Sequence, residues 1–244
     1  MGVMIRQLLL DGRDKSPIES YLQEIYLVFS IFGSISSSVK STHALFPDHI
    51  VEDVLRRAET HSWTGCPAEL LAILYTINRL SSDSYELSSD DIAILFNRLE
   101  QFSPSEWANG SRMIKSKQQR YRLASVYKTA IHMFGSRVLY RSNEPYPENT
   151  INTALAHLSS IRPDDTHFKA IVWPAFVVGM EAYTTEQWNT TARIFGDLYD
   201  FFRTSHLKHA MVALQNIWTH SLSENPKRTW LKYLDMIGYE LLFV

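Results

Sequence analysis

The chain of 244 residues is poor in cysteine and nearly neutral, with one thiol, Cys66, and a formal net charge of −2 at pH 7. A single thiol cannot close an internal disulfide, and it cannot build a zinc cluster, which needs several thiolate ligands. The small net charge provides no general attraction to nucleic acid or to a membrane surface. These shortages exclude a disulfide framework and fit a reducing compartment.

Long apolar runs are also missing, since no stretch reaches the roughly 20 residues that span a bilayer. Residues 1–15 lack the long apolar core and the cleavage site of a secretory signal. Gly2 is not followed by the serine or threonine that a myristoylation signal requires. We therefore expect an intracellular protein that is neither secreted nor bound to a membrane, with residues 1–15 as a tail.

The sequence patterns of common catalytic sites are absent. No G-x-x-x-x-G-K-[ST] or G-x-G-x-x-G loop is present to bind phosphates, and no G-x-S-x-G turn is present to hold a nucleophile. Cys66 precedes Pro67 at the expected start of a helix, where a thiol pKa could be lowered. We favour instead a small residue that fills a turn. The sequence predicts no catalytic residue and no cofactor.

Two clusters of polar residues also have structural interpretations. His206 and His209 lie three residues apart, and Lys208 stands between them where a helical zinc site would carry an acid. We interpret them as a surface pair and expect no metal site. Asp164 and Asp165 follow a proline and precede a helix, so we interpret them as helix-capping residues rather than as a catalytic pair.

What the chain does contain is helical periodicity, with 45% hydrophobic and 12% aromatic residues to form a core. The first helix follows Ser16 and Pro17, and its apolar residues step by three and four along one face: Ile18, Leu22, Ile25, Phe29 and Phe32. Further helices are expected near residues 48–58, 67–77, 92–102, 104–110, 118–138, 148–161, 185–202 and 206–219, and from about Lys227. No stretch alternates as a strand would. We predict an all-α array of roughly ten antiparallel helices in one domain, residues 16–244, with a soft break near residues 141–147.

Residues 167–182, HFKAIVWPAFVVGMEA, are apolar almost all round, which is typical of a helix in the middle of a core. Pro174 marks either the first turn of that helix or a tolerated kink. Trp173 beside it needs an acceptor for its indole N–H. Glu181 places a charge among apolar neighbours.

The same segment resembles the W-P-hydrophobic-hydrophobic-hydrophobic-x-G-x-E-A signature of the fungal-specific transcription factor regulatory domain. Further resemblances follow in the order of that family: residues 64–71 with 77–80, residues 121–127, then Trp218, Trp230 and residues 238–242. The resemblance extends over roughly residues 18–244. It implies an all-α regulatory domain.

One departure from that family concerns DNA binding, because its DNA-binding module holds zinc with six cysteines and this chain has one. The chain resembles the regulatory domain without the DNA-binding module. The resemblance then implies a nuclear or nucleo-cytoplasmic transcription regulator that does not bind DNA directly. It would act through protein partners, either transcription machinery or a DNA-binding relative. It could also sense a small molecule, form a homo- or hetero-dimer, and act on a metabolic or secondary-metabolite gene cluster.

Two groups of residues are candidates for a binding site. A basic face arises because no acidic residue lies between Glu106 and Glu144, and it comprises Arg112, Lys115, Lys117, Arg120, Arg122 and Lys128. We prefer a solvated helix face to a surface for phosphates or acidic partners. An apolar pocket could be lined by Trp173, Glu181, Tyr183, Trp188, Trp218 and His167. The sequence does not distinguish such a pocket from a packed core.

Two alternatives therefore stay open. A helical scaffold with an aromatic pocket could be a biosynthetic enzyme of the cyclase or isomerase kind, or the chain could be a scaffold or dimerisation module. A deep pocket with buried ionisable groups would favour the enzyme. A large exposed apolar patch would favour the interaction module.

Overall fold

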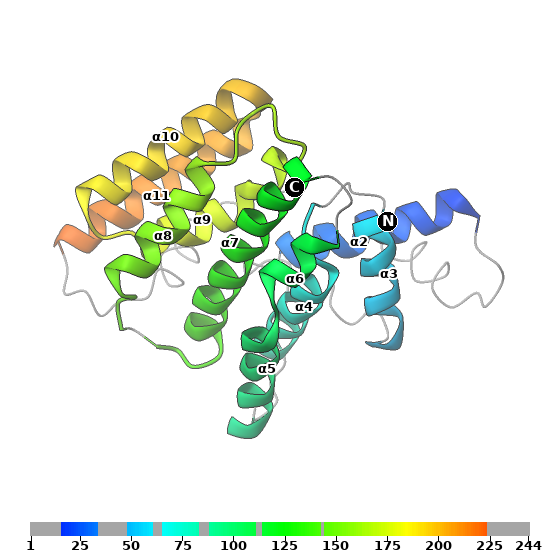
Figure 1. Ribbon diagram of the computed structural model, residues 1–244. Helices are drawn as coiled ribbons and strands as arrows, with labels where there is room; N and C mark the ends of the chain where they lie inside the picture. The colour runs from blue at the N-terminus through cyan, green and yellow to red at the C-terminus, as the bar shows by residue number, and fades with distance from the viewer. Residues whose placement is uncertain are drawn as a thin grey trace.

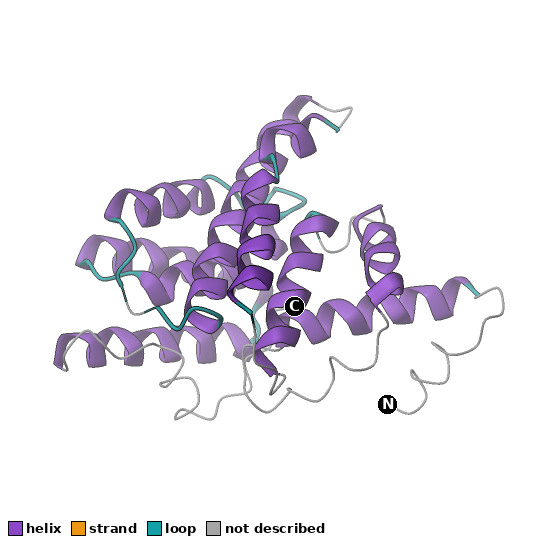
Figure 2. Ribbon diagram, turned by 90° about the horizontal axis from the view of Figure 1, so that it is seen from below, coloured by secondary structure: helices purple, strands orange, loops and turns teal. Residues whose placement is uncertain are grey.

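The computed structural model describes residues 16–33, 48–60, 65–82, 88–110, 114–142 and 144–223. In these ranges the chain forms ten α-helices and one 3-10 helix, and Figure 2 shows no strand among them. The all-α prediction is confirmed. None of the described helices combines the length and the apolar character needed to cross a bilayer.

The first half of the fold consists of five helices around α4. They are α2 (Pro17–Gly33), α3 (Asp48–Thr60), α4 (Ala68–Ser82), α5 (Ser89–Gln101) and α6 (Pro104–Asn109). Helix α5 begins three residues before its predicted start at Ile92, because Ser88 caps it by accepting a hydrogen bond from the Asp91 N–H at 3.1 Å, and Pro104 opens α6 as predicted. The helical periodicity turns one apolar side of α3 and of α4 inward, and these side chains are buried: Val51, Val54 and Ala58 of α3, and Leu70, Leu71, Leu74 and Ile77 of α4.

The second half surrounds one short helix. It comprises α7 (Ile114–Val138), α8 (Glu148–Ser159), the 3-10 helix η3 (Phe168–Ile171), α9 (Val172–Glu181), α10 (Thr185–Phe202) and α11 (Ser205–Ser223). Helix α9 contacts α7, α8, α10 and α11 (Figure 1). Residues 173–181 are all buried, so the prediction of a central helix is confirmed. Pro174 is the third residue of α9, in the first turn, where its missing N–H interrupts no helical hydrogen bond.

Helix α2 forms where the periodicity predicts it, but it buries only part of the predicted apolar face, since Phe32 is 4% exposed and Ile25 is half-buried. Ile18 is 72% exposed, Leu22 40% and Phe29 37%. The buried side instead carries Gln23 and Glu24 together with Leu27, Val28 and Ile31. Partners from α3 and α4 explain this orientation. Arg57 lies 3.4 Å from Glu24 Oε1, and the Asn78 amide donates to the Ile31 carbonyl at 2.8 Å.

Two sequence predictions concern the C-terminal segment and the connection between α7 and α8. The final helix from Lys227, with Trp230 and residues 238–242, lies outside the described residues. Residues 141–147 join α7 to α8, and a soft domain break there stays a prediction.

Candidate functional site

Trp173 lies at the centre of an aromatic cluster and is only 1% exposed. Its ring stacks on Tyr127, with centroids 5.9 Å apart and an interplanar angle of 12°. Phe32 and Phe134 lie 5.9 and 6.0 Å away, so the cluster joins α2, α7 and α9. The indole N–H has no hydrogen-bond acceptor within the described residues. Trp173 is therefore a packed anchor rather than the exposed wall of a cavity.

Two further tryptophans close the other side of α9. Trp188 and Trp218 stack with centroids 5.8 Å apart. The Trp218 indole donates to the Gly179 carbonyl at 2.8 Å, and the Trp188 indole donates to the Ala182 carbonyl at 2.9 Å. Both acceptors lie at the carboxyl end of α9, so the two rings cap carbonyls of this helix.

Gly179 is needed because α10 and α11 approach α9 closely at this residue. A Cβ atom there would lie 2.8 Å from Thr191 Cγ2 and 3.2 Å from Leu214 Cδ2, shorter than normal contact. Gly196 provides a contrast, because a Cβ on it would meet nothing within 4 Å. The glycine of the family signature therefore sets the distance between three helices.

We expect Gly179→Ala to lower the free energy of unfolding and Gly196→Ala to raise it. Alanine gains up to about 1 kcal/mol of helix propensity at either site. At residue 179 this gain is exceeded by an overpacking cost of about 1–3 kcal/mol. Adding Thr191→Ser to Gly179→Ala removes the clashing methyl group and should recover part of the lost free energy of unfolding. Urea unfolding compares the natural chain, the two alanine variants and this double variant. Equal effects of the two alanine substitutions would contradict the close approach of the helices.

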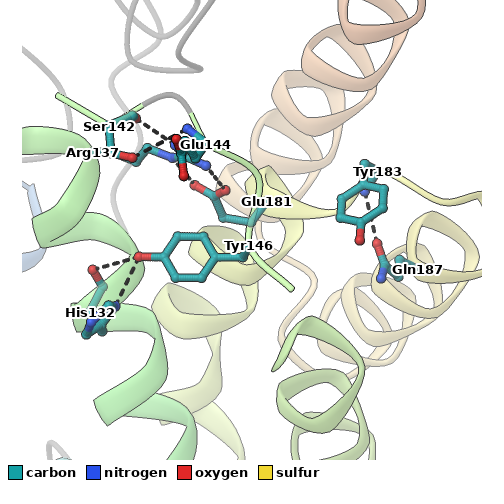
Figure 3. Close-up of polar contacts among 8 residues, drawn as sticks. All are labelled: His132, Arg137, Ser142, Glu144, Tyr146, Glu181, Tyr183 and Gln187. Atoms are coloured by element: carbon teal, nitrogen blue, oxygen red, sulfur yellow. Dashed lines mark hydrogen bonds and ion pairs between the residues drawn. The ribbon is translucent and has the colours of Figure 1, made fainter. Parts of the chain in front are cut away.

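Glu181 forms a buried ion pair with Arg137 of α7, as Figure 3 shows. The Arg137 Nε and Nη2 donate to the two Glu181 oxygens at 2.8 and 2.6 Å, and the side chains are 6% and 3% exposed. Nη1 donates to the Ser142 carbonyl at 2.6 Å. Burial alone would lower the pKa of Arg137, but its hydrogen bonds to Glu181 and the carboxylate charge outweigh burial and raise it.

The sequence reasoning missed Arg137 as a partner, although a signal was present. Arg137 follows Phe134 by three residues, so it lies on the buried stripe of α7 rather than on its wet face. The loop after α7 covers the pair, because the Arg137 guanidinium lies 5.5 Å from the Tyr146 ring. The Tyr146 hydroxyl in turn contacts His132 Nδ1 at 3.0 Å and its carbonyl at 3.2 Å. Burial lowers the pKa of His132.

His167 and Asp165 form the turn before η3. The His167 backbone N–H donates to Asp165 Oδ1 at 2.8 Å, so this aspartate closes a turn, while the N-cap of η3 is His167 and has no side-chain capping bond. The His167 ring is buried, and Nδ1 has no hydrogen-bond partner within the described residues. Burial lowers the pKa of the ring. A Cβ on Gly65, whose φ is +65°, would lie 3.2 Å from this nitrogen, so the ring packs against a backbone that favours glycine.

Cys66 is completely buried beside that turn. Burial, and to a lesser extent the charge of Glu59, raises the pKa of its thiol well above the ordinary value. The alternative that the helix start lowers the pKa of this thiol is therefore wrong, because the desolvation of a thiolate outweighs the helix dipole.

The six candidate pocket residues lie in separate surroundings. Trp173 belongs to the aromatic cluster, Trp188 and Trp218 stack on each other, and Glu181 points to Arg137. Tyr183 is 44% exposed, and its backbone N–H donates to Gln187 Oε1 at 3.0 Å, away from the ion pair (Figure 3). None of the six lines the three clefts that lie beside Trp107, Arg193 and Tyr146, and a pocket formed by the six residues stays a prediction.

On the candidate basic face, Arg120 is tied to Trp107 and Glu59. Its guanidinium lies 3.6 Å from the centre of the Trp107 ring and 3.8 Å from Glu59 Oε1. Burial lowers the pKa of Arg120, while the Glu59 charge opposes that change. Arg120 therefore fastens α7 to α6 and α3.

The other cations of this face have similar contacts where they are described. Lys128 donates to the carbonyls of Glu100 and Phe102 at 2.7 and 3.2 Å, and Arg122 donates to the Ser160 carbonyl at 3.2 Å. Lys117 is half-buried. Arg112 and the side chain of Lys115 lie outside the described parts of the chain. The described arginines and Lys128 link α7 to its neighbours.

A groove of about 370 Å³ lies between α3, α4, α5 and α6. Glu59 forms one end, where it accepts the Ala68 N–H at 2.7 Å and the Trp107 indole N–H at 2.6 Å. Along the rim, Arg98 lies 2.9 Å from Glu52 and 3.8 Å from Glu69. Arg56 and Arg98 also line the groove, so its carboxylates already face arginines, and the Trp107 ring is covered by Arg120.

The described residues contain no group of three or more His, Cys, Asp and Glu side chains that could hold a metal ion. His206 and His209 are both exposed on α11. The described structure thus combines a packed helical interior with open grooves between its helices.

Comparison with known proteins gives a consistent result. The model of a family described as "Fungal specific transcription factor domain" matches residues 2–244. The chain is 26% identical over 197 residues to "Acriflavine sensitivity control protein acr-2" of Neurospora crassa, which covers 70% of this chain and 32% of that protein. The chain thus spans about a third of the length of this relative. No solved structure matches.

Proposed function

We propose, since the chain belongs to the family of the fungal-specific transcription factor domain, that it is the regulatory part of a transcription regulator and acts through protein contacts. The similarity to acr-2 supports a regulator. In this proposal the protein works in the nucleus, and a zinc-cluster relative makes the contact with DNA. The one cysteine within these 244 residues cannot supply the thiolates of a zinc cluster, so this part of the protein contributes none of the zinc ligands.

The observation that carries the proposal is the contrast between a packed interior and an apolar stripe on α2. The interior polar groups are largely paired, as the ion pair of Arg137 and Glu181 illustrates. The stripe comprises Ile18, Tyr21, Leu22 and Phe29, all of which are exposed. Exposed apolar surface of this kind is typical of protein contact sites. The contacts of Arg120, Arg122 and Lys128 also reduce the charge available to DNA phosphates.

A finer proposal concerns what the regulator responds to. The name of the relative refers to acriflavine, which is a flat aromatic cation. In the groove between α3 and α6, Glu52 and Glu69 pair with Arg98, and Arg120 covers the Trp107 ring, so an aromatic cation would bind there in place of one of these arginines. We propose that the chain senses small aromatic cations there and regulates genes of a metabolic or secondary-metabolite cluster.

A pull-down from fungal nuclear extract at low and high salt, with and without acriflavine, tests both proposals. We expect a zinc-cluster protein or transcription machinery to be recovered at both salt concentrations, because an apolar contact is not screened by salt. Acriflavine should change the recovered amount for the natural chain but not for Glu69→Gln. Recovery of neither kind of partner would overturn the regulator proposal, and an unchanged amount with acriflavine would overturn the sensing proposal alone.

A further inference from the structure

A cleft separate from the groove between α3 and α6 lies where the turn after α8 meets η3 and α10. Helices α8 and α10 contact each other in this half of the fold (Figure 1), and the cleft beside them has a volume of about 270 Å³. Its floor is apolar and buried, and it comprises Leu158, Ile161, Phe168, Ile171 and Ile194. Its polar rim consists of Ser159, Arg162, Arg193 and Asp197. The cleft therefore offers an apolar surface to one end of a molecule and charged groups to the other.

The two arginines of the rim differ in their partners. The Arg193 guanidinium donates to the Ser159 hydroxyl at 2.9 Å, but it lies 3.9 Å from Asp197, and both of these charged side chains are more than half exposed. The guanidinium of Arg162 has no hydrogen bond or ion pair within the described residues. Two cations and one carboxylate leave a positive charge unbalanced at the rim. An anion with a single charge would neutralise it.

We propose that this cleft binds a small monocarboxylate with an apolar body, with its carboxylate between Arg162 and Arg193 and its hydrocarbon part on the floor. The planar guanidinium group matches the geometry of a carboxylate, which a neutral amide does not offer. The apolar floor favours a ligand with a hydrocarbon part over a bare inorganic anion, because covering apolar surface is favourable. The volume suits one small ring or a short branched chain, since drug-sized ligands occupy sites of about 300 Å³ or more. The neighbouring Asp164 and Lys169 are exposed, carry opposite charges and do not line the cleft.

A ligand in this cleft would join three elements that surround α9. Phe168 belongs to η3, which leads directly into α9, and its ring stacks on Phe202 of α10 with centroids 6.2 Å apart. Ser159 is the last residue of α8. A ligand that contacts all three elements only in the folded chain should raise the melting temperature as its concentration increases. The inference concerns a different cleft and the opposite ligand charge from the sensing of aromatic cations, so the two proposals fail independently.

Calorimetric titration of the full chain with benzoate tests the site, because benzoate combines one ionised carboxylate with one ring at neutral pH. We expect a dissociation constant of about 0.1–1 mM, together with a rise in melting temperature. Benzamide has the same shape without the charge, and acetate has the charge without the ring. Each of these two compounds should bind at least about tenfold more weakly than benzoate, because each loses one half of the recognition.

Substitutions at the rim then locate the bound carboxylate. Arg162→Gln and Arg193→Gln should each weaken benzoate binding at least about tenfold, since each removes one guanidinium group. Asp197→Asn should instead tighten binding, because it removes the carboxylate that competes for Arg193. The matched control is Arg56→Gln, because the Arg56 side chain is also exposed, at 74%, and lines the groove between α3 and α6. It should leave benzoate binding unchanged. All four side chains are exposed, so the variants should keep nearly the natural melting temperature without benzoate.

Several results would overturn the proposal. These are no binding of benzoate at concentrations up to about 10 mM, equal affinity for benzoate and either benzamide or acetate, and natural affinity in both Arg162→Gln and Arg193→Gln. Weaker binding in Arg56→Gln, with natural affinity in the two rim variants, would place the anion in the groove between α3 and α6, and it would also overturn the proposal.

Discussion

Replacing Arg137 by alanine should lower the free energy of unfolding by about 3–5 kcal/mol, because it leaves the Glu181 carboxylate buried without its partner. The pair is joined by two hydrogen bonds, of 2.8 and 2.6 Å, and both side chains are almost fully buried. The same substitution also releases the Ser142 carbonyl from the loop after α7. Urea unfolding followed by circular dichroism measures the change.

Two further variants distinguish the burial of the charge from the mere loss of a contact. Arg98→Ala breaks an ion pair with Glu52 whose side chains are 41% and 48% exposed, and it should cost at most about 1 kcal/mol. The double variant Arg137→Met with Glu181→Leu removes both charges and should be closer to the natural stability than Arg137→Ala alone. If Arg137→Ala cost no more than Arg98→Ala, the buried pair would not hold α7 against α9.

Trp173→Ala should destabilise the fold by about 3–5 kcal/mol, since it empties the space between Tyr127, Phe32 and Phe134. The more informative variant is Trp173→Phe. The indole N–H of Trp173 is buried without an acceptor among the described residues, so its loss removes a desolvation penalty. We therefore expect phenylalanine to be tolerated much better than alanine.

Trp218→Phe is the matched control. This indole is also buried, but it donates to the Gly179 carbonyl at 2.8 Å, so its loss removes a hydrogen bond worth about 1 kcal/mol. Chemical denaturation of both phenylalanine variants should show the larger loss for Trp218. The opposite order would mean that the Trp173 indole makes a stabilising contact in solution.

These effects explain the family signature within residues 173–182 in structural terms. Trp173 anchors the aromatic cluster, and Pro174 lies in the first turn of α9, where proline is tolerated. Gly179 allows α10 and α11 to approach, and Glu181 holds α7. Each of these residues has a packing role in the described structure. The residues of the signature therefore stabilise the fold, and the functional contacts of the domain are better sought on its surface.

The groove and the stripe illustrate two kinds of surface that follow from this architecture. The groove arises where Glu59 ties the start of α4 to Trp107, so its walls are fixed by hydrogen bonds of 2.7 and 2.6 Å. The stripe arises because α2 packs a second apolar side against the fold, with Leu27, Val28 and Ile31 beside the ion pair of Glu24 and Arg57.

The sequence by itself determined the helices and the centre of the fold. Apolar residues at steps of three and four located α5 to within three residues of its start, and Pro104 marked the start of α6, from local preferences alone. The apolar run around Trp173 had no wet face, so only a buried position was available to it.

Only the tertiary structure decided which face of α2 is buried and which charges meet. The buried Glu24 of α2 pairs with Arg57, 33 residues farther along the chain, and the pairing of Arg137 with Glu181 joins residues 44 apart. Periodicity reports the hydrophobicity of one helix, but it contains no information about the partner that neutralises a buried charge. That partner is set by how the helices pack, because the free energy of a buried ion depends on groups far away in the chain.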